Sequence, residues 1–91
     1  MDKKLKAKWV KALRSGRYKQ GRVYMYNDGR YCCLGVLACV MGHNPAKEGQ
    51  DRYDLALEAL GNEPMYALIG LNDDLERPPF EVIAGFVDAT L

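Results

Sequence analysis

Residues 31–41 read Tyr-Cys-Cys-Leu-Gly-Val-Leu-Ala-Cys-Val-Met and form the longest apolar run of the chain. The run is shorter than the roughly 18–20 residues that a helix needs to cross a bilayer, so it predicts buried core and no membrane span. Its first residues, together with Arg30, are typical of a β-strand, whereas the later apolar side chains recur at helical spacing. We therefore predict a strand over 30–33 that leads into a short buried helix over 34–41.

The segment before this run predicts the other half of a β-hairpin. Residues 23–26 read Val-Tyr-Met-Tyr and are rich in strand-forming side chains. Residues 27–29 read Asn-Asp-Gly, a turn sequence in which Gly29 can take a positive φ without a Cβ clash. The strand over 30–33 would then return beside residues 23–26.

Helical patterns lie on both sides of the hairpin. Asp2 can cap a first helix over 3–15 that ends before Gly16, with Trp9 on its apolar stripe. Downstream, the sequence predicts the following elements: a polar loop over 44–50, a helix over 53–60, a helical turn over 64–69, a loop at 72–74 and a last helix beginning at Pro79. The expected fold is a single α+β domain over residues 1–91: an N-terminal helix, a β-hairpin, then three short helices packed on the sheet.

Charge is divided unevenly along the chain. Residues 1–30 carry ten basic side chains against two acidic ones, and residues 31–91 carry three basic side chains against ten acidic ones. The net charge of +1 conceals this asymmetry. It favours an anionic partner for the basic end, or pairing of the two ends within one molecule or between two.

Three lysines on the first helix, Lys4, Lys8 and Lys11, form a candidate surface for an anionic partner. Phosphates of a nucleic acid, an anionic membrane surface or an acidic protein would each fit these charges. The alternative is a solvated helix face whose charge the acidic half of the chain balances.

The stretch over 14–22 reads Arg-Ser-Gly-Arg-Tyr-Lys-Gln-Gly-Arg and is a second candidate. Guanidinium forks, exposed backbone N–H groups and an aromatic ring suit a phosphate or a nucleotide, although the spacing is not that of a Walker loop. The predicted ligand-binding residues are Arg14, Arg17, Tyr18, Lys19, Gln20, Arg22 and Asn72. The stretch could equally be a connector with helix caps.

The sequence offers no pattern of metal ligands or of catalytic residues. Cys32 and Cys33 are adjacent, so a disulfide between them would be strained, and on a strand they would point to opposite faces. We predict reduced thiols in a cytoplasmic protein, with no metal and no cofactor. Asp73 and Asp74 are a carboxylate pair, but a turn or capping role explains them as well as catalysis does.

Several segments together resemble a widespread group of short, largely uncharacterised proteins of tailed bacteriophages and bacteria. The matching segments are Lys8-Trp9-Val10-Lys11-Ala12-Leu13-Arg14-Ser15-Gly16, Tyr18-Lys19-Gln20-Gly21-Arg22, Tyr31-Cys32-Cys33-Leu34-Gly35-Val36-Leu37, Leu71-Asn72-Asp73-Asp74 and the helix with Phe80, Ile83 and Ala84. The resemblance implies a phage or mobile-element origin and transfers no catalytic residue. The chain departs from the group at Ala38-Cys39, where relatives tend to have Cys-Asp, and over 75–79.

Three functions therefore remain open. The first is a non-enzymatic phage accessory protein, of the host-takeover or anti-defence type, that binds a nucleotide signal or a nucleic acid stoichiometrically. The second is a protein–protein inhibitor that docks on a host enzyme through its charged faces. The third is a nucleotide-processing enzyme that uses Asp73 or Asp74. A homodimer that pairs the basic half of one copy with the acidic half of another is also possible.

Overall fold

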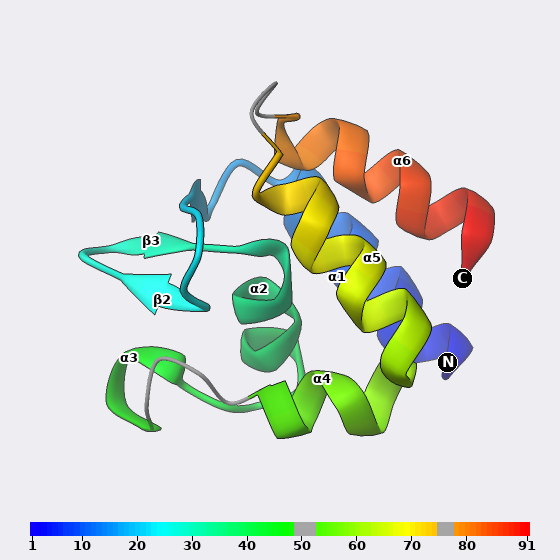
Figure 1. The fold of residues 1–91 in the computed structure, drawn as a ribbon, viewed down its shortest axis with the longest axis horizontal. Helices are drawn as coiled ribbons and strands as arrows, with labels where there is room; N and C mark the ends of the chain where they lie inside the picture. Colours follow the sequence, from blue (N-terminus) through cyan, green and yellow to red (C-terminus); the bar gives the residue numbers. More distant parts are fainter. Residues whose placement is uncertain (49–52, 75–77) are drawn as a thin grey trace.

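A computed structural model describes residues 1–48, 53–74 and 78–91 of the chain (Figure 1). Its elements, in order, are α1 (Lys3–Arg14), β1 (Lys19–Gln20), β2 (Tyr26–Asn27), β3 (Arg30–Tyr31), α2 (Cys33–Val40), α3 (Pro45–Glu48), α4 (Tyr53–Leu60), α5 (Asn62–Asn72) and α6 (Phe80–Thr90). The fold is α+β, as predicted, with helices as its dominant part.

Helix α1 forms as the sequence predicts. The Asp2 carboxylate accepts a hydrogen bond from the backbone N–H of Leu5 at 2.8 Å, which satisfies one free donor of the first turn. Trp9 and Leu13 are buried against the core, and the helix packs between α6 and α2. Gly16 follows the helix at φ 76°, a conformation that glycine adopts without steric cost.

Helix α2 is the centre of the core, and its side chains from Cys33 to Ala38 are all buried. Trp9 of α1 donates its indole N–H to the carbonyl of Cys33 at 2.9 Å, so the lone tryptophan both fills space and satisfies a backbone acceptor. The predicted strand is wrong at its last two residues. Cys32 is the N-cap of α2, and its Sγ accepts a hydrogen bond from the backbone N–H of Gly35 at 3.4 Å.

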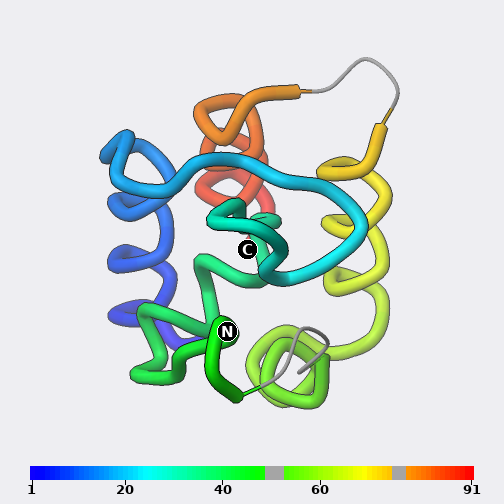
Figure 2. The backbone as a smooth tube through the Cα atoms, turned by 90° about the vertical axis from the view of Figure 1, so that its left-hand side faces the viewer, coloured from blue at the N-terminus to red at the C-terminus, as the bar shows by residue number. Residues whose placement is uncertain are grey.

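The chain between β1 and β2 arches over the beginning of α2 (Figure 2). Gly35 makes this crossing possible, because a Cβ at that position would lie 1.9 Å from the carbonyl oxygen of Met25. The same carbonyl accepts a hydrogen bond from the backbone N–H of Cys32 at 3.3 Å. Glycine is therefore required where two backbones meet, and not for its flexibility.

The sheet is small, with the strand order β1-β3-β2. The predicted hairpin is present only next to its turn, as the antiparallel pair β2–β3, in which Tyr26 lies opposite Tyr31. The first predicted strand is wrong at residues 23–25, which do not pair with β3. Asp28 and Gly29 have φ angles of 51° and 79°, and positive φ at both central residues is what a type I′ turn requires. The parallel strand β1 was not predicted, because a strand of two residues has no periodicity to detect.

The later helices differ from the prediction in number and length. Within the described residues, five helices follow the hairpin and pack largely on one another and on α1, where three helices packed on the sheet were expected. Helix α4 agrees with the prediction, whereas α5 is longer than the predicted helical turn. Helix α6 begins at Phe80, one residue later than predicted, and it buries Ile83 and Val87 as expected of its apolar face.

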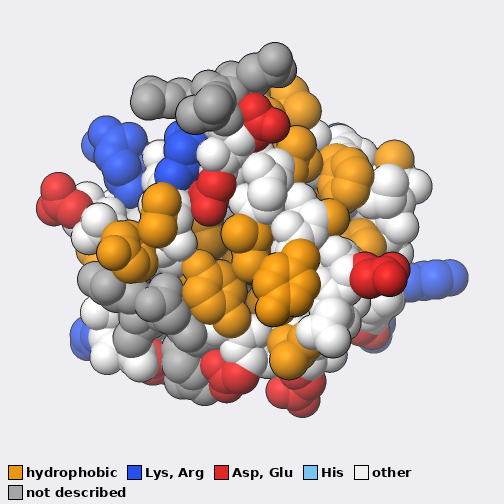
Figure 3. Space-filling model, viewed as in Figure 1, with side chains coloured by type: hydrophobic (Ala, Val, Ile, Leu, Met, Phe, Trp, Pro, Cys, Tyr) orange, Lys and Arg blue, Asp and Glu red, His pale blue; other side chains and the backbone are white. Residues whose placement is uncertain are grey.

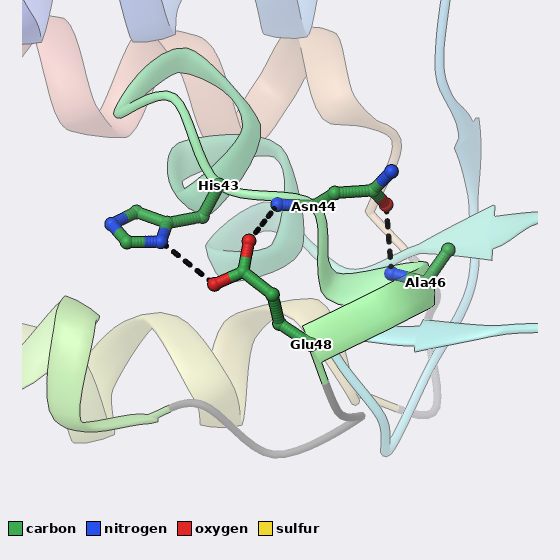
Figure 4. A network of polar contacts seen from close by, with 4 residues as sticks. All are labelled: His43, Asn44, Ala46 and Glu48. Atoms are coloured by element: carbon green, nitrogen blue, oxygen red, sulfur yellow. Dashed lines mark hydrogen bonds and ion pairs between the residues drawn. The ribbon is translucent and has the colours of Figure 1, made fainter.

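Helix α3 lies where a polar loop was predicted, and its caps explain why (Figure 4). The side-chain oxygen of Asn44 accepts a hydrogen bond from the backbone N–H of Ala46 at 3.1 Å, and the Glu48 carboxylate accepts one from the backbone N–H of Asn44. The other carboxylate oxygen of Glu48 lies 2.9 Å from Nδ1 of His43. Reciprocal capping of this kind, with Pro45 in the first turn, stabilises even a single helical turn. Residues 49–50 of the predicted loop lie outside the described residues.

Candidate functional site: a basic groove beside helix α1

A groove of about 300 Å³ lies between the second half of α1, the chain that follows it and the end of α2. Its lining residues are Lys8, Lys11, Ala12, Ser15, Arg17, Tyr18 and Val40. The groove combines three cationic side chains with an apolar wall. This combination suits a ligand that carries both negative charge and a flat or apolar part.

The cations of the groove are free to meet a ligand. Lys8, Lys11 and Arg17 are exposed, and none of them forms an ion pair with an acidic side chain of the described residues. Lys4 lies one turn before Lys8 on the same helix and is also exposed and unpaired within that part of the chain. Acidic side chains in the described part of the later half of the chain therefore do not pair with these cations.

The loop that carries Arg17 is held by Ser15. The Ser15 hydroxyl donates to the carbonyl of Ala12 at 2.6 Å and accepts a hydrogen bond from the backbone N–H of Arg17 at 3.2 Å. These bonds turn the chain sharply after α1 and return Arg17 toward Lys8 and Lys11. Ser15, Ala12 and Val40 were not predicted as site residues, although Lys8, Lys11, Ala12 and Ser15 have the spacing of one helix face.

Tyr18 forms the aromatic wall of the groove and is fixed from behind. Its ring meets the ring of Tyr31 edge-on, with centroids 5.2 Å apart. The side chain of Tyr18 also forms a hydrogen bond with the Cys39 thiol. Burial, the larger effect, raises the pKa of the thiol, whereas this bond lowers it. A ring held by two neighbours loses little entropy when a ligand packs against it.

The other predicted ligand-binding residues are spread around the groove. Arg14 lines a second, more open hollow of about 570 Å³ on the α6 side of α1, together with Lys11 and Asp88. Lys19 is exposed on the edge strand β1, and Arg22 is half-buried, with its Nε enclosed and without a hydrogen-bond partner in the described structure. Arg17 and Tyr18 are thus the two members of the predicted ligand set that line the groove, joined there by Lys8 and Lys11 of the predicted lysine surface.

Gln20 and Asn72 were predicted to bind a ligand, and the structure places them in a buried polar network. Asn72 is 1% exposed, and its Oδ1 accepts hydrogen bonds from the backbone N–H of Cys33 at 3.1 Å and from Nε2 of Gln20 at 3.3 Å. Its Nδ2 donates to the carbonyl of Gly21 at 2.9 Å and to Asp73. The Asn72 amide thus uses both its donors and its acceptor within the protein.

Asp73 extends this network to the segment between β1 and β2. Its carboxylate accepts hydrogen bonds from Nδ2 of Asn72 at 3.2 Å and from the backbone N–H of Val23 at 2.9 Å. Tyr53 donates its hydroxyl to the carbonyl of the same Val23 at 3.0 Å. Asp73 therefore has a structural role, but it binds the backbone of a segment 50 residues away, where the sequence predicted a local turn or cap.

The cysteines are packing residues in this structure. Burial raises the pKa of Cys32 to about 11 and raises the pKa of Cys33 well above the ordinary thiol value, so both thiols hold their protons. Cys33 donates to the carbonyl of Leu68 at a distance of 3.7 Å, while His43 contacts Glu48. Within the described ranges, His, Cys, Asp and Glu side chains do not gather in threes that could hold a metal ion.

The face over α4 and α5 has a different character (Figure 3). Hydrophobic side chains gather across its middle, acidic side chains lie around them, and Lys and Arg stand at its margins. Leu57 of α4 and Tyr66 of α5 are exposed hydrophobic side chains, with 65% of Tyr66 accessible to solvent. The molecule thus presents a basic face on α1 and an apolar, acidic face elsewhere.

The model of one protein family, described as a domain of unknown function (DUF8296), matches residues 1–58. The match covers more than half of the chain, so the protein belongs to this family, and all residues that line the basic groove lie within the matched part. No curated protein and no solved structure matches the chain. None of the described helices is both long enough and apolar enough to span a membrane.

Proposed function

We propose that the protein binds a phosphate-bearing anion stoichiometrically in the groove beside α1, without turning it over. The observation that carries this proposal is the group of three cations, Lys8, Lys11 and Arg17, around a groove with an aromatic wall. These cations have no acidic partner among the described residues, so they can attract a phosphate without first breaking an ion pair there.

The setting of this activity follows from the resemblance given above. We propose a phage-type accessory protein that works in the cytoplasm of a bacterial host, where it would sequester a nucleotide signal or contact a nucleic acid. Free thiols at Cys32, Cys33 and Cys39 agree with a reducing compartment. A nucleotide-processing enzyme receives less support, because the Asp73 carboxylate is engaged by Val23 and Asn72.

Isothermal titration at low salt tests this function. Tripolyphosphate, mononucleotides and short oligonucleotides serve as ligands for the wild type, for Lys8→Ala and for Arg17→Ala. We expect one site per protomer and weaker binding by each variant. Lys47→Ala on α3 is the matched control, because it removes an exposed lysine outside the groove. Absence of heat with every ligand would refute the proposal.

The apolar, acidic face supports a second candidate function, that of a protein–protein inhibitor. Leu57 on α4 and Tyr66 on α5 are exposed, and the face over these helices has apolar side chains surrounded by acidic ones (Figure 3). Such a face suits a host protein whose apolar surface is rimmed by basic residues. Retention of one defined host protein by the wild type, and its loss with Tyr66→Lys, would favour this function. Retention that survives Tyr66→Lys but not Lys8→Glu would assign the contact to the basic face.

The same two faces allow self-association. A basic α1 on one copy could contact the acidic face of another, and a closed two-fold dimer would make that contact twice. Charge reversal at Lys4, Lys8 and Lys11 should then weaken association at low salt. Sedimentation of a monomer at all salt concentrations would exclude the homodimer.

A further inference from the structure

We propose that the anion is a single strand of nucleic acid, which runs along α1 from Lys4 to Arg17 and places one base in the groove. The proposal rests on the function proposed above and narrows its ligand to one class. Mononucleotides, duplexes and proteins are the alternatives that the experiment below separates.

The cations form a track that is longer than the groove. Lys4, Lys8 and Lys11 lie on successive turns of one helix face, and Lys4 lies outside the groove lining. At a rise of about 1.5 Å per residue, Lys4 and Lys11 are about 10 Å apart along the helix axis. A nucleoside monophosphate offers these lysines a single phosphate, whereas a strand offers several along the same helix face.

The spacing of the track suits consecutive phosphates. In a stacked strand, successive phosphates rise by about 3.4 Å along the helix axis. The three lysines from Lys4 to Lys11 therefore span about three nucleotide steps along α1, and Arg17 lines the groove with Lys8 and Lys11. Each of the four cations is exposed and has no acidic partner within the described residues.

The groove supplies what a base needs. Tyr18 and Val40 form an apolar wall directly beside the cations, and the ring of Tyr18 is held by Tyr31. Aromatic rings beside a basic track are the usual arrangement for single-strand binding, because every base has a face that can stack. In a duplex the bases are already stacked and paired, so none is available to enter the groove.

The α6 side of α1 differs from the groove side. The hollow there is lined by Lys11, Arg14 and Asp88 of α6, whose carboxylate offsets part of the attraction of the two cations for phosphates. Helix α1 is also packed against both α6 and α2, so it does not project as a helix that enters a major groove must. The groove side of α1 therefore combines cations with an apolar wall, whereas the α6 side mixes cations with the Asp88 carboxylate.

Fluorescence anisotropy with a labelled oligothymidylate of roughly twelve nucleotides tests the proposal. Thymidine monophosphate and a duplex of the same length compete against it. We expect the oligonucleotide to bind at least about tenfold more tightly than either competitor. We also expect the logarithm of its association constant to fall with the logarithm of salt concentration with a slope of about −3, from four cations at about −0.7 each.

Variants locate the strand. Lys4→Ala should reduce the magnitude of the salt slope by about 0.7, and Lys47→Ala on α3 should leave it unchanged. Tyr18→Leu should weaken oligonucleotide binding about tenfold, whereas Tyr18→Phe keeps the ring and most of the affinity. Circular dichroism on each variant verifies that α1 stays folded.

The outcomes separate this proposal from the one on which it rests. If thymidine monophosphate binds as tightly as the oligonucleotide and Lys4→Ala leaves the slope unchanged, the strand is refuted and the anion site stands. If the duplex binds as tightly as the single strand or more tightly, the strand is likewise refuted. If none of the three ligands binds, both proposals fail for nucleic acids.

Discussion

The side-chain oxygen of Asn72 accepts a hydrogen bond from the backbone N–H of Cys33 at 3.1 Å, which joins the end of α5 to the beginning of α2. The same amide donates to the carbonyl of Gly21, in the loop that follows β1. One buried side chain thus fixes three segments that are far apart in sequence. It also steadies the chain after Tyr18, and through it the aromatic wall of the groove.

Loss of the Asn72 amide should be costly for folding. In Asn72→Ala, the N–H of Cys33 and the carbonyl of Gly21 lose their partners in a buried place, and we expect the free energy of unfolding to fall by about 3 kcal/mol. Asn62→Ala is the matched control, because Asn62 is exposed at the start of α5 and should change stability by less than about 0.5 kcal/mol. Urea denaturation of both variants tests this; equal effects would show that the network contributes little.

Gly35 should tolerate no side chain. In Gly35→Ala the new Cβ would meet the carbonyl oxygen of Met25 at 1.9 Å, and neither backbone can move without unpacking α2. We expect a loss of more than about 3 kcal/mol. Gly85→Ala in α6 meets nothing within 4 Å and should instead stabilise the protein by about 0.5–1 kcal/mol. Thermal denaturation compares the two, and a mild effect at Gly35 would contradict the observed crossing.

Replacing Val23 with a residue that tolerates its backbone conformation should stabilise the protein. It has a φ of 75°, which is unfavourable for a β-branched residue, and its side chain is exposed. Val23→Asn should therefore raise the free energy of unfolding by about 1 kcal/mol. The same change at exposed Val82, which lies in α6, should be nearly neutral. If both substitutions have the same effect on chemical denaturation, Val23 is not strained.

The stability of the protein should fall in alkaline solution, because the Cys32 thiol loses its proton more readily in the unfolded chain than in the folded one. Burial raises the pKa of this thiol from its ordinary value of 9.0 to about 11. Between these values the unfolded chain releases the proton and the folded chain keeps it, so each pH unit lowers the free energy of unfolding by about 1.4 kcal/mol. Below pH 9.0 the stabilising contribution is fully present, and above about pH 11 it is lost.

Cys32→Ser isolates this effect. Serine is a favoured N-cap residue, so it can replace Sγ as the acceptor for the N–H of Gly35 while removing the titrating group. We expect the decline of stability between pH 9.0 and about 11 to become shallower by the contribution of one thiol. Urea unfolding across that interval measures both proteins, and parallel curves would mean that Cys32 does not titrate as proposed.

The local structure of this protein was largely predictable from its sequence. The Asp2 cap, the apolar stripe around Trp9 and the stop at Gly16 all act within one helix, and α1 formed accordingly. The Asp28-Gly29 turn is equally local. The strand that was expected to reach Cys33 ends at Tyr31. The N–H of Cys33 instead donates to Oδ1 of Asn72, a partner that is near it only in the folded molecule.

The site was predictable only in part for the same reason. Basic side chains on α1 and in the following loop could be found from charge alone, and Lys8, Lys11 and Arg17 do meet. The sequence pattern over 14–22 did not distinguish these groove residues from Gln20. The Gln20 side chain donates a hydrogen bond to the carbonyl of Pro78 at 2.9 Å and does not line the groove. Val40 also lines the groove, but it belongs to the central apolar run. Its place in the groove depends on how α2 packs, which the distribution of charge along the sequence does not indicate.

The most direct test of the central claim is an NMR titration of the ¹⁵N-labelled protein with the oligothymidylate at low salt. The account predicts one binding event per protomer, with the largest shifts at the backbone amides of Lys8, Lys11, Ser15 and Arg17. Shifts centred on Leu57 and Tyr66, or no shifts at any concentration, would contradict it.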